Sequence, residues 1–130
     1  MFLLTVVVAG CGSESPKEKA DLGQARSVVV RFAAADDASA CGLMTANALK
    51  AIYGNFKGKA AKARANCVKK SAGFKGDKVT IIKSSLIDHL TAKVVAHSSD
   101  EKFSYSVNLR RRAAGKPWRI DSISQAKLTS

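Results

Sequence analysis

The stretch FSYSVNLRRRAAGKPWRIDSI, residues 103–123, decides the fold class. Between residues 103 and 110, apolar and polar side chains alternate with a period of two, which is typical of a half-buried β-strand. A second alternating segment covers residues 118–123. The link between them, residues 113–117, contains Gly and Pro, which favour a reversal of the chain. The stretch therefore predicts an antiparallel β-hairpin.

The second strand of this hairpin is expected to keep its alternation without a break. An inward-facing Trp118 then shares its face with Ile120 and Ser122, while Arg119, Asp121 and Ile123 face outward. On this interpretation, the Asp121 carboxylate points to solvent and pairs with a neighbouring cation.

Two further strands are expected upstream of the hairpin. Residues 79–82 are rich in β-branched side chains, and residues 89–97 alternate from Leu90 to Ala96. Together with the hairpin, they predict an antiparallel sheet of about four strands.

Helices are expected before the sheet, because apolar residues recur there at spacings of three and four. The pattern predicts helices over residues 22–36, 46–53 and 59–71, with Thr45 as N-cap and Gly54 as stop signal of the second. The expected stripe of the first is Leu22, Ala25, Val29, Phe32, Ala33 and Asp36, and that of the third is Ala61, Ala65, Val68 and Ala72. The sequence thus predicts an α+β fold in which three N-terminal helices pack against a curved antiparallel sheet.

Length and composition support one folded domain, expected over residues 21–127. The chain has 130 residues, 46% of them hydrophobic and 25% charged, which excludes a wholly disordered or collagen-like protein. It contains no apolar run close to the ~20 residues of a membrane-spanning helix. Its formal net charge is +12, which bears on partners rather than on the fold.

Residues 1–10 are expected to be a signal segment. Residues 2–9 are almost entirely apolar, but no basic residue precedes them, so we expect the start of the signal to be missing. The tetrapeptide VAGC at residues 8–11 resembles the lipobox of bacterial lipoproteins. That resemblance implies cleavage before Cys11 and lipid attachment to its sulfur. The alternative is a short buried strand or helix.

A lipidated Cys11 would place the protein outside the cell, anchored to the outer face of the bacterial cell membrane. Residues 11–20 are polar and contain Gly, Ser and Pro, so they are expected to form a flexible tether. Two cysteines then remain, Cys41 and Cys67. In an oxidising compartment, they are expected to form a disulfide that closes a loop of about 27 residues and stabilises the fold by roughly 3.5 kcal/mol. Two buried thiols are the alternative, while a metal pair is disfavoured because neither C-x-x-C spacing nor a nearby His is present.

Residues 22–126 resemble the nuclear-transport-factor-2-like superfamily, which has a cystatin-like cone architecture. The features that carry the resemblance are the helix at residues 25–33 with Asp36-Asp37 after it, the turn Cys41-Gly42-Leu43-Met44-Thr45 similar to small exported actinobacterial members, the later Cys67, and the C-terminal hairpin ending in Trp118-Arg119-Ile120-Asp121. The resemblance implies that Trp118 packs inside the cone. It does not imply one activity, because the superfamily includes isomerases, dehydratases and plain binding modules.

The candidates for catalysis are few. Asp36 follows the stripe of the first helix, and Tyr53 and Tyr105 lie on apolar faces, where an acid–base pair could form in a cone pocket. The simpler interpretation makes Asp36 a solvated helix end and the tyrosines core residues. We therefore expect a non-enzymatic domain without cofactor or metal that binds a small molecule or an envelope component, with a small isomerase- or dehydratase-like enzyme as the alternative.

The positive charge is concentrated in the middle of the chain. Ten cations lie there: Lys50, Lys57, Lys59, Lys62, Arg64, Lys69, Lys70, Lys75, Lys78 and Lys83. They could form a patch for a polyanion such as anionic lipid or a cell-wall polymer, or simply a solvated surface. Nucleic acid is a less favoured partner, because few aromatic side chains lie between the cations.

Overall fold

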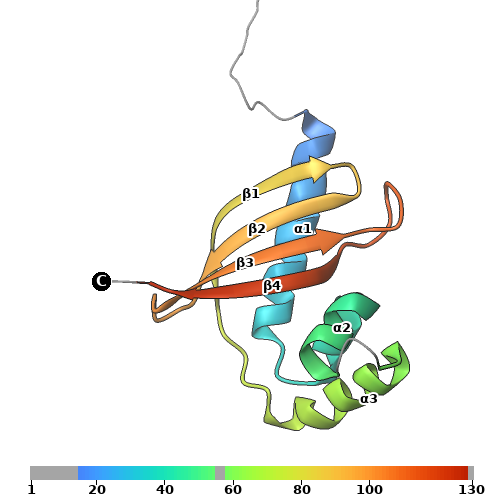
Figure 1. Ribbon diagram of the computed structural model, residues 1–130. Coiled ribbons are helices and arrows are strands. Elements are labelled where there is room, and N and C mark those ends of the chain that lie inside the picture. The colour runs from blue at the N-terminus through green and yellow to red at the C-terminus, as the bar shows by residue number, and fades with distance from the viewer. Residues whose placement is uncertain (1–14, 55–57, 129–130) are drawn as a thin grey trace, which may run out of the picture.

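The computed structural model describes residues 15–54 and 58–128. It contains the helices α1 (Pro16–Ala34), α2 (Ala46–Tyr53) and α3 (Ala60–Lys70), and the short 3-10 helices η1 (Ala38–Leu43) and η2 (Ser71–Gly73). The strands β1 (Thr80–Asp88), β2 (Thr91–His97), β3 (Phe103–Arg110) and β4 (Arg119–Lys127) form one antiparallel sheet in the order β1-β2-β3-β4 (Figure 1). The predicted α+β class, with helices before an antiparallel sheet, is confirmed.

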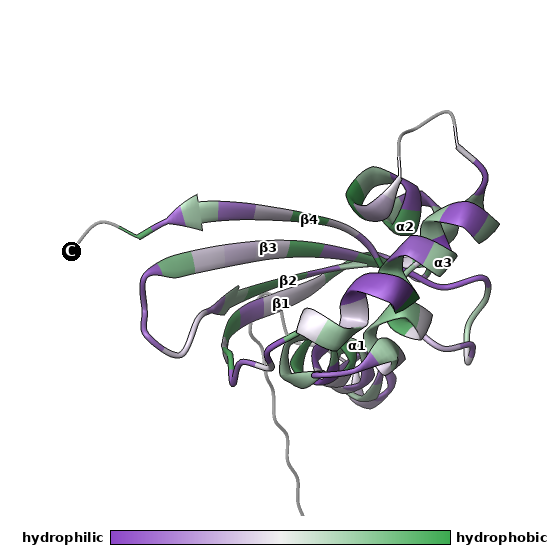
Figure 2. Cartoon of the chain, turned by 90° about the horizontal axis from the view of Figure 1, so that it is seen from below, coloured by the Kyte–Doolittle hydropathy of each residue, from purple (hydrophilic) through white to green (hydrophobic). Residues whose placement is uncertain are grey.

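The elements form two layers. Helix α1 crosses one face of the sheet, and α2 and α3 lie together near β4 (Figures 1 and 2). The core lies between α1 and the sheet, where Leu22, Ala25, Val94, Leu109 and Ile120 are each at most 1% exposed. None of the described helices is both long and apolar enough to cross a membrane.

Helix α1 begins at Pro16, earlier than the sequence predicts. The Ser15 hydroxyl accepts a hydrogen bond from the Glu18 backbone N–H, and the Glu18 carboxylate accepts one from the Ser15 N–H at 3.0 Å. This capping box, with Pro16 in the first turn, starts a helix in a polar segment that buries nothing before Leu22. Residues 16–20 of the expected tether are therefore helical and Ser15 caps them, whereas residues 11–14 of the tether and the expected signal segment lie outside the described residues.

The second predicted helix is confirmed at both ends, whereas the expected buried face of the third is wrong. The Thr45 hydroxyl caps α2 by accepting from the Ala48 N–H, and Gly54 ends the helix. In α3, the buried residues are Ala63 and Cys67, and Val68 is 48% exposed. The orientation differs because the disulfide turns the Cys67 side of α3 inward.

A β-bulge in β4 corrects the predicted alternation of that strand. Leu109 pairs with Ile120 and Asn108 with Ser122, so Asp121 is the extra residue. Beyond the bulge the faces exchange, and Ile123 rather than Ser122 joins the core. The Asp121 carboxylate accepts a hydrogen bond from the Thr45 hydroxyl at 2.8 Å and forms no ion pair with any described residue, so the expected pairing with a cation is wrong.

The segment that leads into β1 runs directly against the end of α1. The Asp77 N–H donates to the Ala33 carbonyl at 2.7 Å. A Cβ at Gly76 would lie only 2.2 Å from the Ala34 carbonyl oxygen, so no larger residue fits there without a shift of the backbone. Gly76 therefore allows the close approach that closes one side of the cavity described next.

Candidate functional site

A cavity of about 470 Å³ lies between the helices and the inner face of the sheet. Its lining is mainly apolar and comes from α1, α2, the segment before β1, and strands β2 to β4. The apolar and aromatic lining side chains are Val29, Phe32, Ala33, Ala35, Ala40, Ile52, Tyr53, Phe74, Val79, Ala96, Tyr105, Val107, Ile120 and Ile123. Such a surface favours an apolar ligand.

The two predicted tyrosines both line this cavity. Tyr53 ends α2 and stands beside Phe74, with 6.2 Å between the ring centroids. Burial raises the pKa of the Tyr53 phenol above 10.0, so the group is neutral at pH 7 and can either donate or accept one hydrogen bond. Tyr105 is half-buried on β3. The cavity thus has an apolar body with phenol groups among its walls.

Asp36 is not among the residues that line the cavity, although the alternative enzyme hypothesis requires it there. Helix α1 ends at Ala34, and Ala35 has extended backbone angles, with φ −67° and ψ 130°. The helical stripe therefore stops before Asp36, which is exposed. The combination of Asp36 with Tyr53 or Tyr105 that the alternative enzyme hypothesis requires is not assembled.

The lining of the cavity also includes three polar residues: Lys75, Asp77 and Gln125. The sequence assigned Lys75 to the basic patch and did not indicate Asp77 or Gln125 as site residues. The Asp77 carboxylate accepts hydrogen bonds from the Ser99 hydroxyl and, at 3.2 Å, from the Ser99 N–H. These bonds lower the pKa of Asp77, so the carboxylate is ionised, already bonded and poorly suited to proton transfer near neutral pH. Its segment has neither helical nor strand periodicity, which is why no pattern pointed to it.

The predicted disulfide is present. Cys41 of η1 and Cys67 of α3 are bonded, with their Cα atoms 6.0 Å apart and both residues buried. The bond joins the chain before α2 to the helix after it. Among the described residues, no group of three or more His, Cys, Asp or Glu side chains could hold a metal ion.

The ten predicted basic residues do not share one element or one edge. Four exposed lysines belong to α3 or its start: Lys59, Lys62, Lys69 and Lys70. Lys75 lines the cavity, whereas Lys78 and Lys83 belong to β1 or its start, at the sheet edge opposite β4 (Figure 1). The Arg64 guanidinium donates to the Cys41 carbonyl at 3.4 Å, and Lys50 is half-buried on α2. Lys57 lies outside the described residues.

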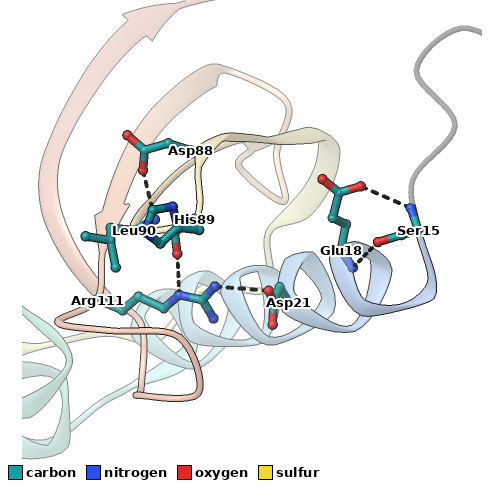
Figure 3. Close-up of polar contacts among 7 residues, drawn as sticks. All are labelled: Ser15, Glu18, Asp21, Asp88, His89, Leu90 and Arg111. Atoms are coloured by element: carbon teal, nitrogen blue, oxygen red, sulfur yellow. Dashed lines mark hydrogen bonds and ion pairs between the residues drawn. The ribbon is translucent and has the colours of Figure 1, made fainter.

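A buried arginine joins three segments at the end of the fold where α1 begins (Figure 3). Arg111 donates through Nη2 to Asp21 of α1 at 3.0 Å, and through Nε to the His89 carbonyl in the β1–β2 turn at 2.7 Å. Its guanidinium also lies 4.4 Å from the centre of the Trp118 ring. The Arg111 hydrogen bond lowers the pKa of Asp21. These contacts hold the β3–β4 loop against α1.

Comparisons with protein-family models, curated proteins and solved structures find no match for this chain. A functional interpretation therefore depends on the cavity, the charged groups and the sequence features.

Proposed function

We propose that this protein is an extracytoplasmic, lipid-anchored domain that binds a small, mainly apolar ligand in its cavity. The observation that carries the proposal is the cavity of about 470 Å³ between α1 and the sheet. Ligand pockets in proteins are commonly about 300–1,000 Å³, mostly apolar, and have a few polar groups that orient the ligand. Here, the phenols of Tyr53 and Tyr105 are suited to meet one polar end of the ligand.

The side chains that line this cavity are consistent with binding a ligand without catalysing a reaction. Asp77 is the carboxylate among the lining residues, and it already accepts hydrogen bonds from Ser99. The phenol of Tyr53 has a raised pKa, which disfavours its action as a base. A hydrogen-bonding and apolar surface remains, which is sufficient for recognition.

Location and family complete the proposal. The lipobox-like VAGC at residues 8–11 supports anchoring through Cys11, and the Cys41–Cys67 disulfide is compatible with an oxidising, extracytoplasmic compartment. The helices-then-sheet order supports assignment to the nuclear-transport-factor-2-like cone, where such a domain would hold its ligand between the sheet and the first helix.

Filling the cavity should weaken ligand binding. We expect Ile123→Trp, at the inner face of β4, to weaken binding of the neutral apolar probe N-phenyl-1-naphthylamine by about tenfold or more, because the indole would occupy the space that the probe needs. Fluorescence titration of the full chain measures the affinity.

The matched control is Ser124→Trp, which adds the same side chain one residue later, at an exposed position that does not line the cavity. This variant should bind the probe within about twofold of the unmodified chain, and thermal unfolding should show that both variants are folded. Equal probe affinity for Ile123→Trp and the unmodified chain would contradict the cavity as the binding site.

Lipidation of Cys11 should place the protein in the membrane fraction. Mass spectrometry of that fraction should find a chain beginning at a diacylglyceryl-modified Cys11, and Cys11→Ser should move the protein out of the fraction, because two or more acyl chains are required for stable anchoring. The control is Ser13→Ala, which leaves the cysteine intact. A free Cys11 thiol on membrane-bound protein would disprove the anchor.

A further inference from the structure

A second hollow lies beside the loop that connects β3 to β4. We propose that it binds a phosphate-bearing anion. Its volume is about 490 Å³, and its lining includes the cations Arg110, Arg112, Lys116 and Arg119. It is separate from the apolar cavity, because the two sets of lining residues have no member in common. The inference does not depend on the proposed function of that cavity.

The charge of this basic pocket is not neutralised by the described part of the chain. Arg111 also lines it, but Asp21 balances that charge. None of the other four cations forms an ion pair within residues 15–54 and 58–128. Asp121 is the one carboxylate among the described lining residues, and the Thr45 hydroxyl donates to it. Three positive charges therefore remain in excess, more than enough to bind one phosphate group with a charge of about −2.

The register of the sheet forces two of these cations together. Arg110 and Arg119 are directly opposite partners at the end of the β3–β4 ladder next to the connecting loop, and both are exposed on the face away from the core. Like charges at opposite positions of an antiparallel pair destabilise it. An anion between the two guanidinium groups would convert this repulsion into two attractions. Guanidinium groups suit phosphate because their planar N–H groups can donate two parallel hydrogen bonds.

The loop that completes the pocket is held in place rather than free. Gly115 has φ +82°, a conformation that favours glycine, and the Lys116 N–H donates to the Ala113 carbonyl at 3.0 Å. The stack of Arg111 on Trp118 fixes the base of the loop. Arg112 and Lys116 are therefore presented from a defined turn, which reduces the entropy cost of bringing them to an anion.

Arg111 supplies a second observation that points to a ligand. Its side chain is 1% exposed, and its Nη1 has no hydrogen-bond partner among the described residues. A buried guanidinium nitrogen without a partner is costly, and native proteins normally satisfy such groups. An anion oxygen held beside Arg111 would provide the missing acceptor.

The test compares two charge-matched double variants of the full chain. R112Q/K116Q removes two cations from the basic pocket, and K62Q/K69Q removes two exposed cations from α3. Binding of inorganic phosphate is followed by changes in amide chemical shifts. We expect the dissociation constant to rise about tenfold for R112Q/K116Q and by less than about twofold for K62Q/K69Q, since a local site depends on local contacts whereas both pairs change the net charge equally. The single variant K116Q provides a second measurement if the double variant is poorly folded.

A second arm identifies the source of the phosphate. Association with phosphatidylglycerol vesicles is measured for the same variants, all of which share residues 1–14. If R112Q/K116Q weakens both phosphate and vesicle binding more than K62Q/K69Q does, the pocket is supported as a site for lipid headgroups. If it weakens phosphate binding alone, the pocket is supported as a site for a soluble phosphate compound. Equal weakening by both pairs, or no phosphate binding by the unmodified chain, overturns the proposal.

Discussion

Removal of the Cys41–Cys67 disulfide is expected to lower the free energy of unfolding by about 3.5 kcal/mol. The two cysteines are 26 residues apart, and the loop between them contains all of α2 and most of α3. Without the bond, the unfolded chain gains the conformational freedom of that loop, while the folded chain keeps its other contacts. For a domain with a stability of about 5–15 kcal/mol, this is a large fraction of the total.

Urea unfolding of the double variant Cys41→Ala/Cys67→Ala measures the loss. Both positions are at most 2% exposed, so the variant also removes buried sulfur atoms, and its stability should fall at least as far as that of the reduced protein. The control is the addition of reductant to the double variant, which should leave its unfolding midpoint unchanged. Alkylation of Cys41 and Cys67 in the native protein under oxidising conditions would contradict the prediction. So would an unfolding midpoint of the native protein that does not change when reductant is added.

Local signals predicted the elements well where the deciding contacts are themselves local. Helix α2 begins and ends at the predicted residues because Thr45 and Gly54 act on the backbone next to them. Strand β3 matches the predicted range because its alternation is regular from end to end. Helix α1 begins before the predicted residue, because the prediction depends on apolar periodicity and the first turns of α1 bury nothing; the local signal for its start is the capping box of Ser15 and Glu18.

Predictions failed where a distant contact decides the outcome. The inward face of α3 is set by its covalent bond to η1, not by its row of alanines. The bulge at Asp121 allows β4 to meet the segment before α2, where the Thr45 N–H donates to the Ile120 carbonyl at 2.8 Å. A period-two pattern contains no information about such an insertion, because each face of residues 120–123 has one apolar candidate, Ile120 or Ile123.

The contrast between local and distant contacts also explains which residues of the candidate site the sequence predicts. The sequence predicts Tyr53 and Tyr105 as candidate site residues because they lie on apolar faces of regular elements, and those faces line the cavity. Asp77 was not found because it lies in an irregular segment that only the close approach at Gly76 brings to α1. The convergence of Arg110 with Arg119 required the register of the sheet, although the run of three arginines was visible in the sequence.

Arg111 is the second position where a single change should have a large effect. We expect Arg111→Met to lower the free energy of unfolding by about 3 kcal/mol at pH 7. The substitution keeps most of the apolar stem but removes the hydrogen bonds to Asp21 and to the His89 carbonyl, together with the contact on Trp118. The loss should lie toward the low end for a broken buried pair, because the Asp21 side chain is 16% exposed and can recruit water.

The matched control is Arg112→Met, the same substitution one residue later at an exposed position. Its effect should stay within about 0.5 kcal/mol, as for most surface substitutions. A similar loss for both variants would mean that the loop responds to any loss of an arginine, which would contradict the structural role assigned to Arg111.

The dependence on pH separates the ion pair from packing. Arg111 lowers the pKa of Asp21 in the folded protein, whereas in the unfolded chain an aspartate titrates near about 3.9. The stabilisation from this pair is therefore fully present above that unfolded value and is lost as the pH falls through the lower folded value. Arg111→Met lacks this contribution at every pH. The difference in unfolding free energy between the two proteins should thus shrink as urea titrations move from pH 7 to below pH 4. A difference that stays constant over this range would assign the whole effect to the hydrogen bond to the His89 carbonyl and the contact with Trp118.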